Sequence, residues 1–183
     1  MDIFCRVGFY PNQGDSNAAN TNNDIRILIN NNNTWTLADR DIVDIQPNRA
    51  YRKIVTVDID NDGDLDLVTN NLNEKASVYQ NNSRQLLKHN FVKVKFKGDG
   101  GNTFGIGAKV ILKTKDGQQL QQMMPTRGFM SSVEPTLLFG IGDLQQVDEM
   151  LVIWENEKMQ IVKNPKINTT LTMEQKNATV NVK

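Results

Sequence analysis

Short apolar runs recur along the chain, several of them alternating with polar residues, and they predict β-strands. In the second half the runs are separated by Gly, Asn or Pro, and they read FVKVKF (91–96), GAKVIL (107–112), MLVIW (150–154) and TTLTM (169–173). No segment sustains an apolar period of about 3.6 residues, which an amphipathic helix would need. The pattern therefore predicts an all-β protein.

Two polar stretches need separate interpretation. QQLQQMM at 118–124 has helical propensity, but it directly follows the turn-forming pair Asp116-Gly117. We therefore predict the second strand of a hairpin there. KVKFKG at 93–98 alternates Lys with apolar residues, which indicates one strand with a solvent-facing side.

The first half contains an internal repeat. Residues 25–32 (IRILINNN) align with residues 76–83 (ASVYQNNS) at an offset of 51, and residues 2–4 (DIF) align with 66–68 (DLV) at an offset of 64. We place the extra residues of the first copy at 10–23, a stretch poor in apolar residues and typical of a loop. The first copy starts in its middle, so we expect further repeats in a longer parent chain.

The segment VDIDNDGDLDLV at 57–68 concentrates five carboxylates within nine positions. They belong to Asp58, Asp60, Asp62, Asp64 and Asp66. Carboxylates this close in sequence repel one another in a tight turn, so the loop requires a compensating cation.

The spacing indicates Ca²⁺. Numbered from Asp58, carboxylates fall at positions 1, 3, 5 and 9, and Gly63 occupies position 6, where the loop must bend sharply. Asp64 at position 7 would contribute its main-chain oxygen and leave its carboxylate to solvent or to a bridging water. Mg²⁺ fits less well because it keeps its waters in a strict octahedron.

Two other interpretations of the acidic loop compete with calcium binding. Asn61-Asp62-Gly63 alone could form a solvated hairpin turn, which explains the bend but not five carboxylates. An EF-hand needs flanking helices and a bidentate Glu at position 12, whereas position 12 is Thr69 and the flanks KIVTV and LDLVT are typical of strands.

The composition of the chain limits the classes of function that it can have. The 183 residues carry 21 basic and 21 acidic side chains, so no net field favours nucleic acid or an anionic membrane. No apolar run approaches the roughly 18 residues of a membrane span. Cys5 is the only cysteine, which excludes an intrachain disulfide, and the first ten residues lack the features of a signal peptide.

The sequence gives little support for a catalytic function. His89 is the only histidine and no Ser or Cys motif accompanies it. The carboxylates could act as a glycosidase pair, but such pairs need different environments and a cleft between them, whereas these share one loop. Trp35 and Trp154 could stack on sugar rings, although we favour a core position for both.

DIDNDGDLDLVTNN followed by SVYQNN resembles the FG-GAP and VCBS repeats, whose pattern is DxDxDGxxD, a strand, and a Tyr- and Asn-rich turn. The resemblance covers residues 1–88, and only the second copy has a complete loop. It implies about two blades of a β-propeller, the first incomplete, with Ca²⁺ held by the acidic loop.

Residues 89–183 resemble the ASPIC/UnbV module, found in a cartilage acidic protein and in bacterial UnbV-like proteins. The resemblance rests on five segments in order: NFVKVKFKG (90–98), GIGAKVIL (105–112), RGFMSS (127–132), LFGIG (138–142) and VDEMLVIW (147–154). We expect this half to fold as a small β-sandwich.

Together the resemblances imply a non-catalytic, calcium-binding module, extracellular or on the cell surface, that interacts with a protein or glycan. Remaining propeller blades in a longer chain are a further expected partner. The alternative is an accessory component of a biosynthetic or polysaccharide-processing enzyme system. Nucleic-acid binding is disfavoured by the balanced charge.

Overall fold

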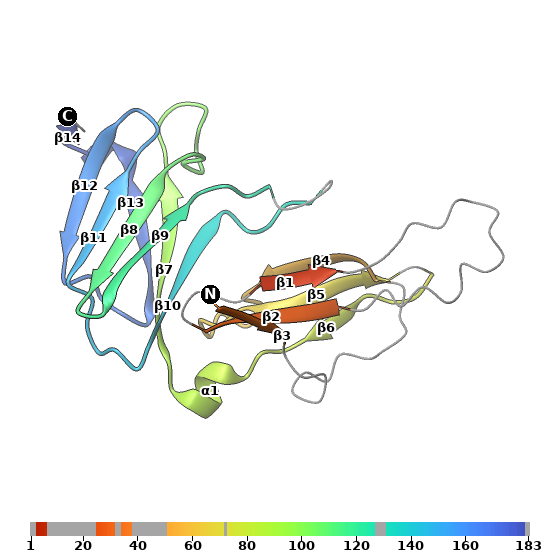
Figure 1. Ribbon diagram of the computed structural model, residues 1–183. Helices are drawn as coiled ribbons and strands as arrows, with labels where there is room; N and C mark the ends of the chain where they lie inside the picture. The colour runs from red at the N-terminus through yellow and green to blue at the C-terminus, as the bar shows by residue number, and fades with distance from the viewer. Residues whose placement is uncertain are drawn as a thin grey trace. The chain divides into compact units, whose positions relative to one another are not determined.

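The computed structural model describes residues 3–6, 25–31, 34–37, 51–71, 73–126 and 131–181, and these are predominantly β-strands (Figure 1). The all-β prediction is confirmed. The helices of the described part are α1 (Ser83–Leu87) and the 3₁₀ turn η3 (Gln175–Asn177). The chain forms two compact units: a repeat unit (Met1–Thr56 and Asp66–Gln80) and a sandwich unit (Val57–Leu65 and Asn81–Lys183). The predicted boundary between residues 88 and 89 stays a prediction.

Within the residues that the structure describes, the repeat unit contains two three-stranded sheets. One has the order β1-β2-β3, formed by β1 (Ile3–Arg6), β2 (Ile25–Asn31) and β3 (Thr34–Leu37). The other has the order β4-β5-β6, formed by β4 (Tyr51–Val57), β5 (Asp66–Asn71) and β6 (Ser77–Tyr79). Small sheets of this kind agree with the propeller blades implied by the repeat.

Strand register supports the internal repeat. In the first copy Ile3 lies opposite Leu28, and in the second copy Leu67 lies opposite Tyr79. These are the positions that the offsets of 64 and 51 residues match. The two sequence copies therefore use the same antiparallel pairing. The predicted insertion at 10–23 lies outside the described residues. So does Asp2, the residue that the offset of 64 aligns with Asp66.

The sandwich unit consists of two sheets (Figure 1). The first has the order β10-β7-β13, formed by β7 (Asn90–Lys97), β10 (Thr136–Gly142) and β13 (Thr169–Glu174). The second has the order β14-β12-β11-β8-β9, formed by β8 (Lys109–Thr114), β9 (Gly117–Gln122), β11 (Glu149–Ile153), β12 (Lys158–Lys163) and β14 (Val180–Asn181). Strand β13 runs parallel to β7, while β10 runs antiparallel to it. The predicted hairpin after Asp116-Gly117 is confirmed, because β8 and β9 pair in antiparallel register.

The core of the sandwich unit comes from alternate positions of these strands. Val92, Val94 and Phe96 of β7 are buried, as are Val110 and Leu112 of β8. This alternation follows from the two-residue period of a strand, which sends successive side chains to opposite faces. Burying such side chains stabilises the fold by about 1.5–3 kcal/mol each.

The two tryptophans differ. Trp154 lies in the core with its ring edge-on to Phe96 at 5.5 Å, and its indole N–H donates to Gln160 at 3.0 Å. The core prediction is confirmed for Trp154. It is wrong for Trp35, whose side chain on the short strand β3 is 45% exposed.

The solvent-facing interpretation of 93–98 is also wrong at one position. Lys95 and Lys97 have exposed side chains, whereas the side chain of Lys93 is only 3% exposed. The physical reason is that Lys93 lies against the acidic loop, whose Asp58 and Asn61 contact its ammonium group. Strand period correctly places Lys93 opposite the core face, but it does not show that another segment covers that face.

Candidate metal centre

The acidic loop, residues 57–65, joins two strands, β4 and β5, as predicted. Its bend is made by Asn61 (φ 59°) and Gly63 (φ 97°). A Cβ atom at Gly63 would lie 2.1 Å from Cε1 of Phe91 on β7. Two features therefore require glycine at position 63: its left-handed backbone conformation and the close approach of the Phe91 ring.

Three carboxylates converge in the loop. Asp58, Asp60 and Asp62 each offer an oxygen, and these oxygens all lie within 4.8 Å of one another. The same side chains accept loop amides: Asp60 from Asp62 N at 3.3 Å and Asp62 from Asp64 N at 3.0 Å. Carboxylate oxygens gathered this closely suit a hard divalent cation that takes oxygen ligands.

Asp64 and Asp66 lie outside this group of three among the residues that the structure describes. Oδ2 of Asp64 accepts hydrogen bonds from Ser83 Oγ at 3.3 Å and from Arg84 N at 3.0 Å, both at the start of α1. The carboxylate of Asp64 is thus held by α1. Asp66 is buried at the first position of β5. A main-chain role for Asp64 and a ligand role for Asp66 stay predictions.

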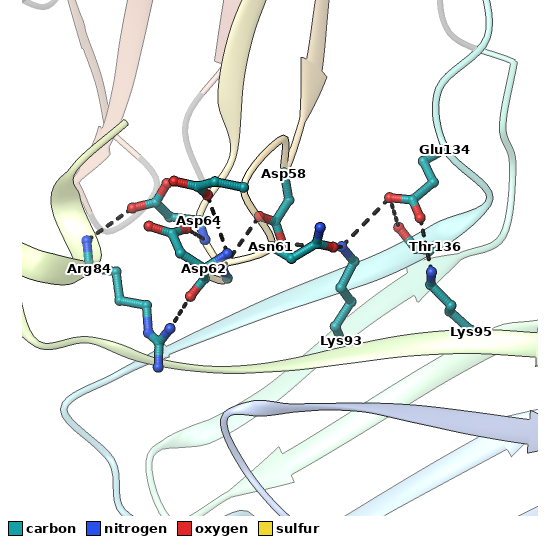
Figure 2. Close-up of polar contacts among 11 residues, drawn as sticks. Asp58, Asn61, Asp62, Asp64, Arg84, Lys93, Lys95, Glu134 and Thr136 are labelled. Atoms are coloured by element: carbon teal, nitrogen blue, oxygen red, sulfur yellow. Dashed lines mark hydrogen bonds and ion pairs between the residues drawn. The ribbon is translucent and has the colours of Figure 1, made fainter. Parts of the chain in front are cut away.

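Lys93 anchors the first end of the loop (Figure 2). Its Nζ lies 3.1 Å from Oδ2 of Asp58, and the two side chains are 3% and 2% exposed. The same ammonium lies 3.4 Å from Oδ1 of Asn61 and 3.6 Å from Oε2 of Glu134. A buried carboxylate is stable only when a charge or several hydrogen bonds compensate it, and Lys93 supplies that charge.

Glu134 continues this network. Burial alone raises its pKa, but the hydrogen bond from Lys95 and the charge of Lys93 outweigh burial and hold the pKa of Glu134 below its usual value. Lys95 Nζ lies 3.1 Å from Oε1 of Glu134 (Figure 2). Glu134 is therefore ionised at neutral pH and shares the charge of Lys93 with Asp58.

Helix α1 anchors the second end of the loop. The guanidinium of Arg84 donates to the main-chain oxygen of Asp62, and its Cζ lies 4.9 Å from the ring centroid of Phe91. Gln85 Nε2 donates to Oδ2 of Asp62. Asp62 is thus contacted through its backbone by Arg84 (Figure 2) and through its side chain by the next residue of α1, Gln85.

Sequence reasoning missed both anchors. Helix α1 is five residues long, too short to show a helical period, although SRQLL consists largely of good helix formers. Lys93 has the same sequence environment as the exposed Lys95. No local pattern separates the two, because Lys93 is buried by contact with Asp58, which lies 35 residues earlier in the chain.

The small repeated sheets, the strand-flanked acidic loop and the β-sandwich are typical of a modular all-β protein. Comparison with family models agrees: residues 2–69 match the FG-GAP-like repeat, and residues 98–180 match ASPIC and UnbV. The chain therefore combines an FG-GAP-like repeat segment with an ASPIC and UnbV domain, in the predicted order. A search of curated proteins found no match.

The two matched families have general properties that bear on function. FG-GAP-like and ASPIC and UnbV domains are generally non-catalytic modules. FG-GAP repeats are typically extracellular and often bind calcium. None of the described helices has the length and apolar character needed to cross a membrane.

Proposed function

We propose that the protein is a non-catalytic, calcium-binding module, extracellular or at the cell surface, that interacts with a protein or glycan. The observation that carries the proposal is the convergence of Asp58, Asp60 and Asp62 in a loop of the FG-GAP-like segment. Ca²⁺ is a hard cation that takes six to eight oxygen ligands, so several carboxylates in one loop match its needs.

Asp58, Asp60 and Asp62 would hold the ion through side-chain oxygens, with the predicted Asp64 main-chain oxygen and Asp66 completing the set. Bound Ca²⁺ would neutralise the repulsion among these carboxylates and cross-link the loop. An ion bound only by the folded state stabilises that state by mass action. In this proposal the ion has a structural role and shapes a surface for a partner.

Calcium titration of single variants tests the ligand assignment. We expect Asp60→Ala to abolish Ca²⁺ binding, because position 3 of the loop needs a side-chain oxygen. We expect Asp64→Ala to weaken binding only slightly, because its carboxylate bonds to Ser83 and Arg84 of α1. Asp143→Ala, an exposed carboxylate outside the loop, is the control and should bind as the native chain does.

Isothermal titration calorimetry with Ca²⁺ measures these affinities. Equal losses in Asp60→Ala and Asp64→Ala would contradict the ligand assignment. A native chain that shows neither binding heat nor a higher unfolding midpoint in Ca²⁺ than in EDTA would overturn the calcium proposal. A screen of glycans and protein partners in Ca²⁺ and in EDTA then tests the interaction role.

A further inference from the structure

A polar hollow of about 350 Å³ lies beside the acidic loop, where α1 ends and β7 begins. It is lined by Arg84, Gln85, Lys88, His89 and Asn90. Three of these residues are basic, two carry amides and none carries a carboxylate. The chain as a whole has a net charge of zero, so this lining differs from the average surface.

The walls of the hollow are held in place by neighbouring groups. Lys88 adopts a left-handed backbone (φ 54°) that ends α1, and its N–H donates to Arg84 O at 2.8 Å. The amide of Asn90 donates to Leu144 O at 3.0 Å and accepts from Asn168 Nδ2 at 2.7 Å. A site whose backbone and amides are already fixed loses less entropy when a ligand binds.

Lys88 offers an ammonium group to an anion, and the imidazole of His89 offers a ring N–H. Among the described residues, Lys88 and His89 are exposed and form none of the ion pairs of the sandwich unit. Gln85 uses Nε2 to contact Asp62 and leaves its Oε1 to accept a hydroxyl hydrogen. The lining thus combines an ammonium and an imidazole N–H for a carboxylate with an amide oxygen for hydroxyl groups.

We propose that this hollow binds the uronate unit of an acidic glycan, an inference that rests on the proposed function and names its ligand class. The volume falls within the range of about 300–1,000 Å³ common for small-ligand sites and exceeds the need of a lone carboxylate. The lining side chains end in guanidinium, amide, ammonium and imidazole groups, which can hydrogen-bond to the hydroxyl groups of a sugar as well as to its carboxylate.

Calcium should control this site through Asp62. Arg84 and Gln85, two of the lining residues, both contact Asp62, one of the three converging carboxylates. Without a cation the negative loop repels an anionic ligand, and with Ca²⁺ bound that repulsion falls. The glycan should therefore bind more tightly in Ca²⁺ than in EDTA.

The test is calorimetric titration of the full chain with a hyaluronan tetrasaccharide, which carries glucuronate, in Ca²⁺ and in EDTA. We expect binding in Ca²⁺ and at least a tenfold loss in EDTA. Lys88→Gln combined with His89→Gln should also lose at least tenfold, whereas Lys109→Gln, an exposed lysine on β8 that does not line the hollow, should bind as the native chain does. A neutral chitin tetrasaccharide and inorganic phosphate should both bind weakly.

Each contrary outcome has a defined meaning. Native-like saccharide binding by the double variant, or equal binding of hexaglutamate, overturns the uronate site. Saccharide binding that persists in EDTA overturns its control by calcium. Ca²⁺ titration of the double variant separates this proposal from the calcium proposal, because retained Ca²⁺ affinity with lost saccharide binding assigns the effect to the hollow.

Discussion

Two lysine and carboxylate clusters of the sandwich unit have similar chemistry and opposite surroundings. In one, Lys93 pairs with Asp58 at 3.1 Å, and both side chains are nearly excluded from solvent. In the other, Glu149 contacts Lys113 at 2.7 Å and also pairs with Lys163. Glu149 lies directly opposite both lysines in the strand register of β11 with β8 and β12.

The difference in solvent access determines what each cluster does. Lys113 and Lys163 have exposed side chains, so water replaces much of any interaction that is removed. Such cross-strand pairs contribute modestly to sheet stability. Water cannot replace the interaction between Lys93 and Asp58, since removing either side chain leaves an uncompensated charge in a buried position. The buried pair therefore positions the acidic loop. The cluster around Glu149 adds little to a sheet that apolar packing already stabilises.

Lys93→Met should give the largest effect. It leaves Asp58 buried without its counter-charge, and we expect a loss of about 3–5 kcal/mol in the free energy of unfolding without calcium. Urea unfolding followed by tryptophan fluorescence measures this loss. In a Trp35→Phe background the buried Trp154 is the only tryptophan and reports on the sandwich unit.

Lys113→Met is the matched control and should change the free energy of unfolding far less. Lys93→Arg keeps the positive charge and should retain more stability than Lys93→Met. Similar losses in Lys93→Met and Lys113→Met would show that burial does not separate the two clusters.

The second-largest effect should be a change in how strongly calcium stabilises the protein. If Ca²⁺ and Lys93 both compensate Asp58, the calcium-induced rise in unfolding midpoint should be larger in Lys93→Met than in the native chain. A chain of this size shifts by about 2–4 °C for each kcal/mol. Scanning calorimetry in Ca²⁺ and EDTA measures both shifts. An equal or smaller rise in Lys93→Met, with Lys113→Met unchanged, would mean that the ion does not compensate Asp58.

Glu134→Gln should give an intermediate loss of at most about 1 kcal/mol, because Glu134 is partly exposed and Lys93 keeps Asp58 as a partner. The pKa of Glu134 is lowered in the folded state. Its contribution is therefore present above the unfolded pKa and is lost as the pH falls through the folded value. Urea unfolding at pH 7 and at pH 3 measures the effect, which should be smaller at pH 3; a larger loss at pH 3 would contradict this assignment.

Glu149→Gln should give the smallest change in stability, since both lysine partners of Glu149 have exposed side chains that water can solvate in its place. Hydrogen bonds from Lys113 and Lys163 lower the pKa of Glu149 to about 2. The folded-state pKa is depressed, so the stabilising charge persists below the usual pKa of glutamate and disappears only as the pH approaches about 2. Carboxyl chemical shifts measured by NMR across this range give the titration midpoint, and a midpoint near 4.5 would contradict the paired geometry.

Sequence reasoning succeeded where a local pattern determines the structure. Strand period predicted the all-β fold, the Asp116-Gly117 pair predicted a hairpin, and Asp spacing around Gly63 predicted a strand-flanked loop that brings carboxylates together. It failed where distant segments meet. Nothing near Lys93 in sequence indicates that Asp58 will cover it, and nothing near Asp64 indicates that the first turn of α1 will bind its carboxylate.

The parallel pairing of β7 with β13 also constrains the order in which the protein can fold during synthesis. Thr169 of β13 pairs with Val92 of β7, so the sheet that carries Lys93 is complete only after the ribosome has released residues more than seventy positions later. Pairings of such long sequence separation form slowly because a large loop must close first. During that interval the acidic loop and Lys93 have both emerged, but β7, which carries Lys93, still lacks its neighbour β13. The nascent chain thus holds both partners of the buried ion pair before the sheet that fixes one of them is complete.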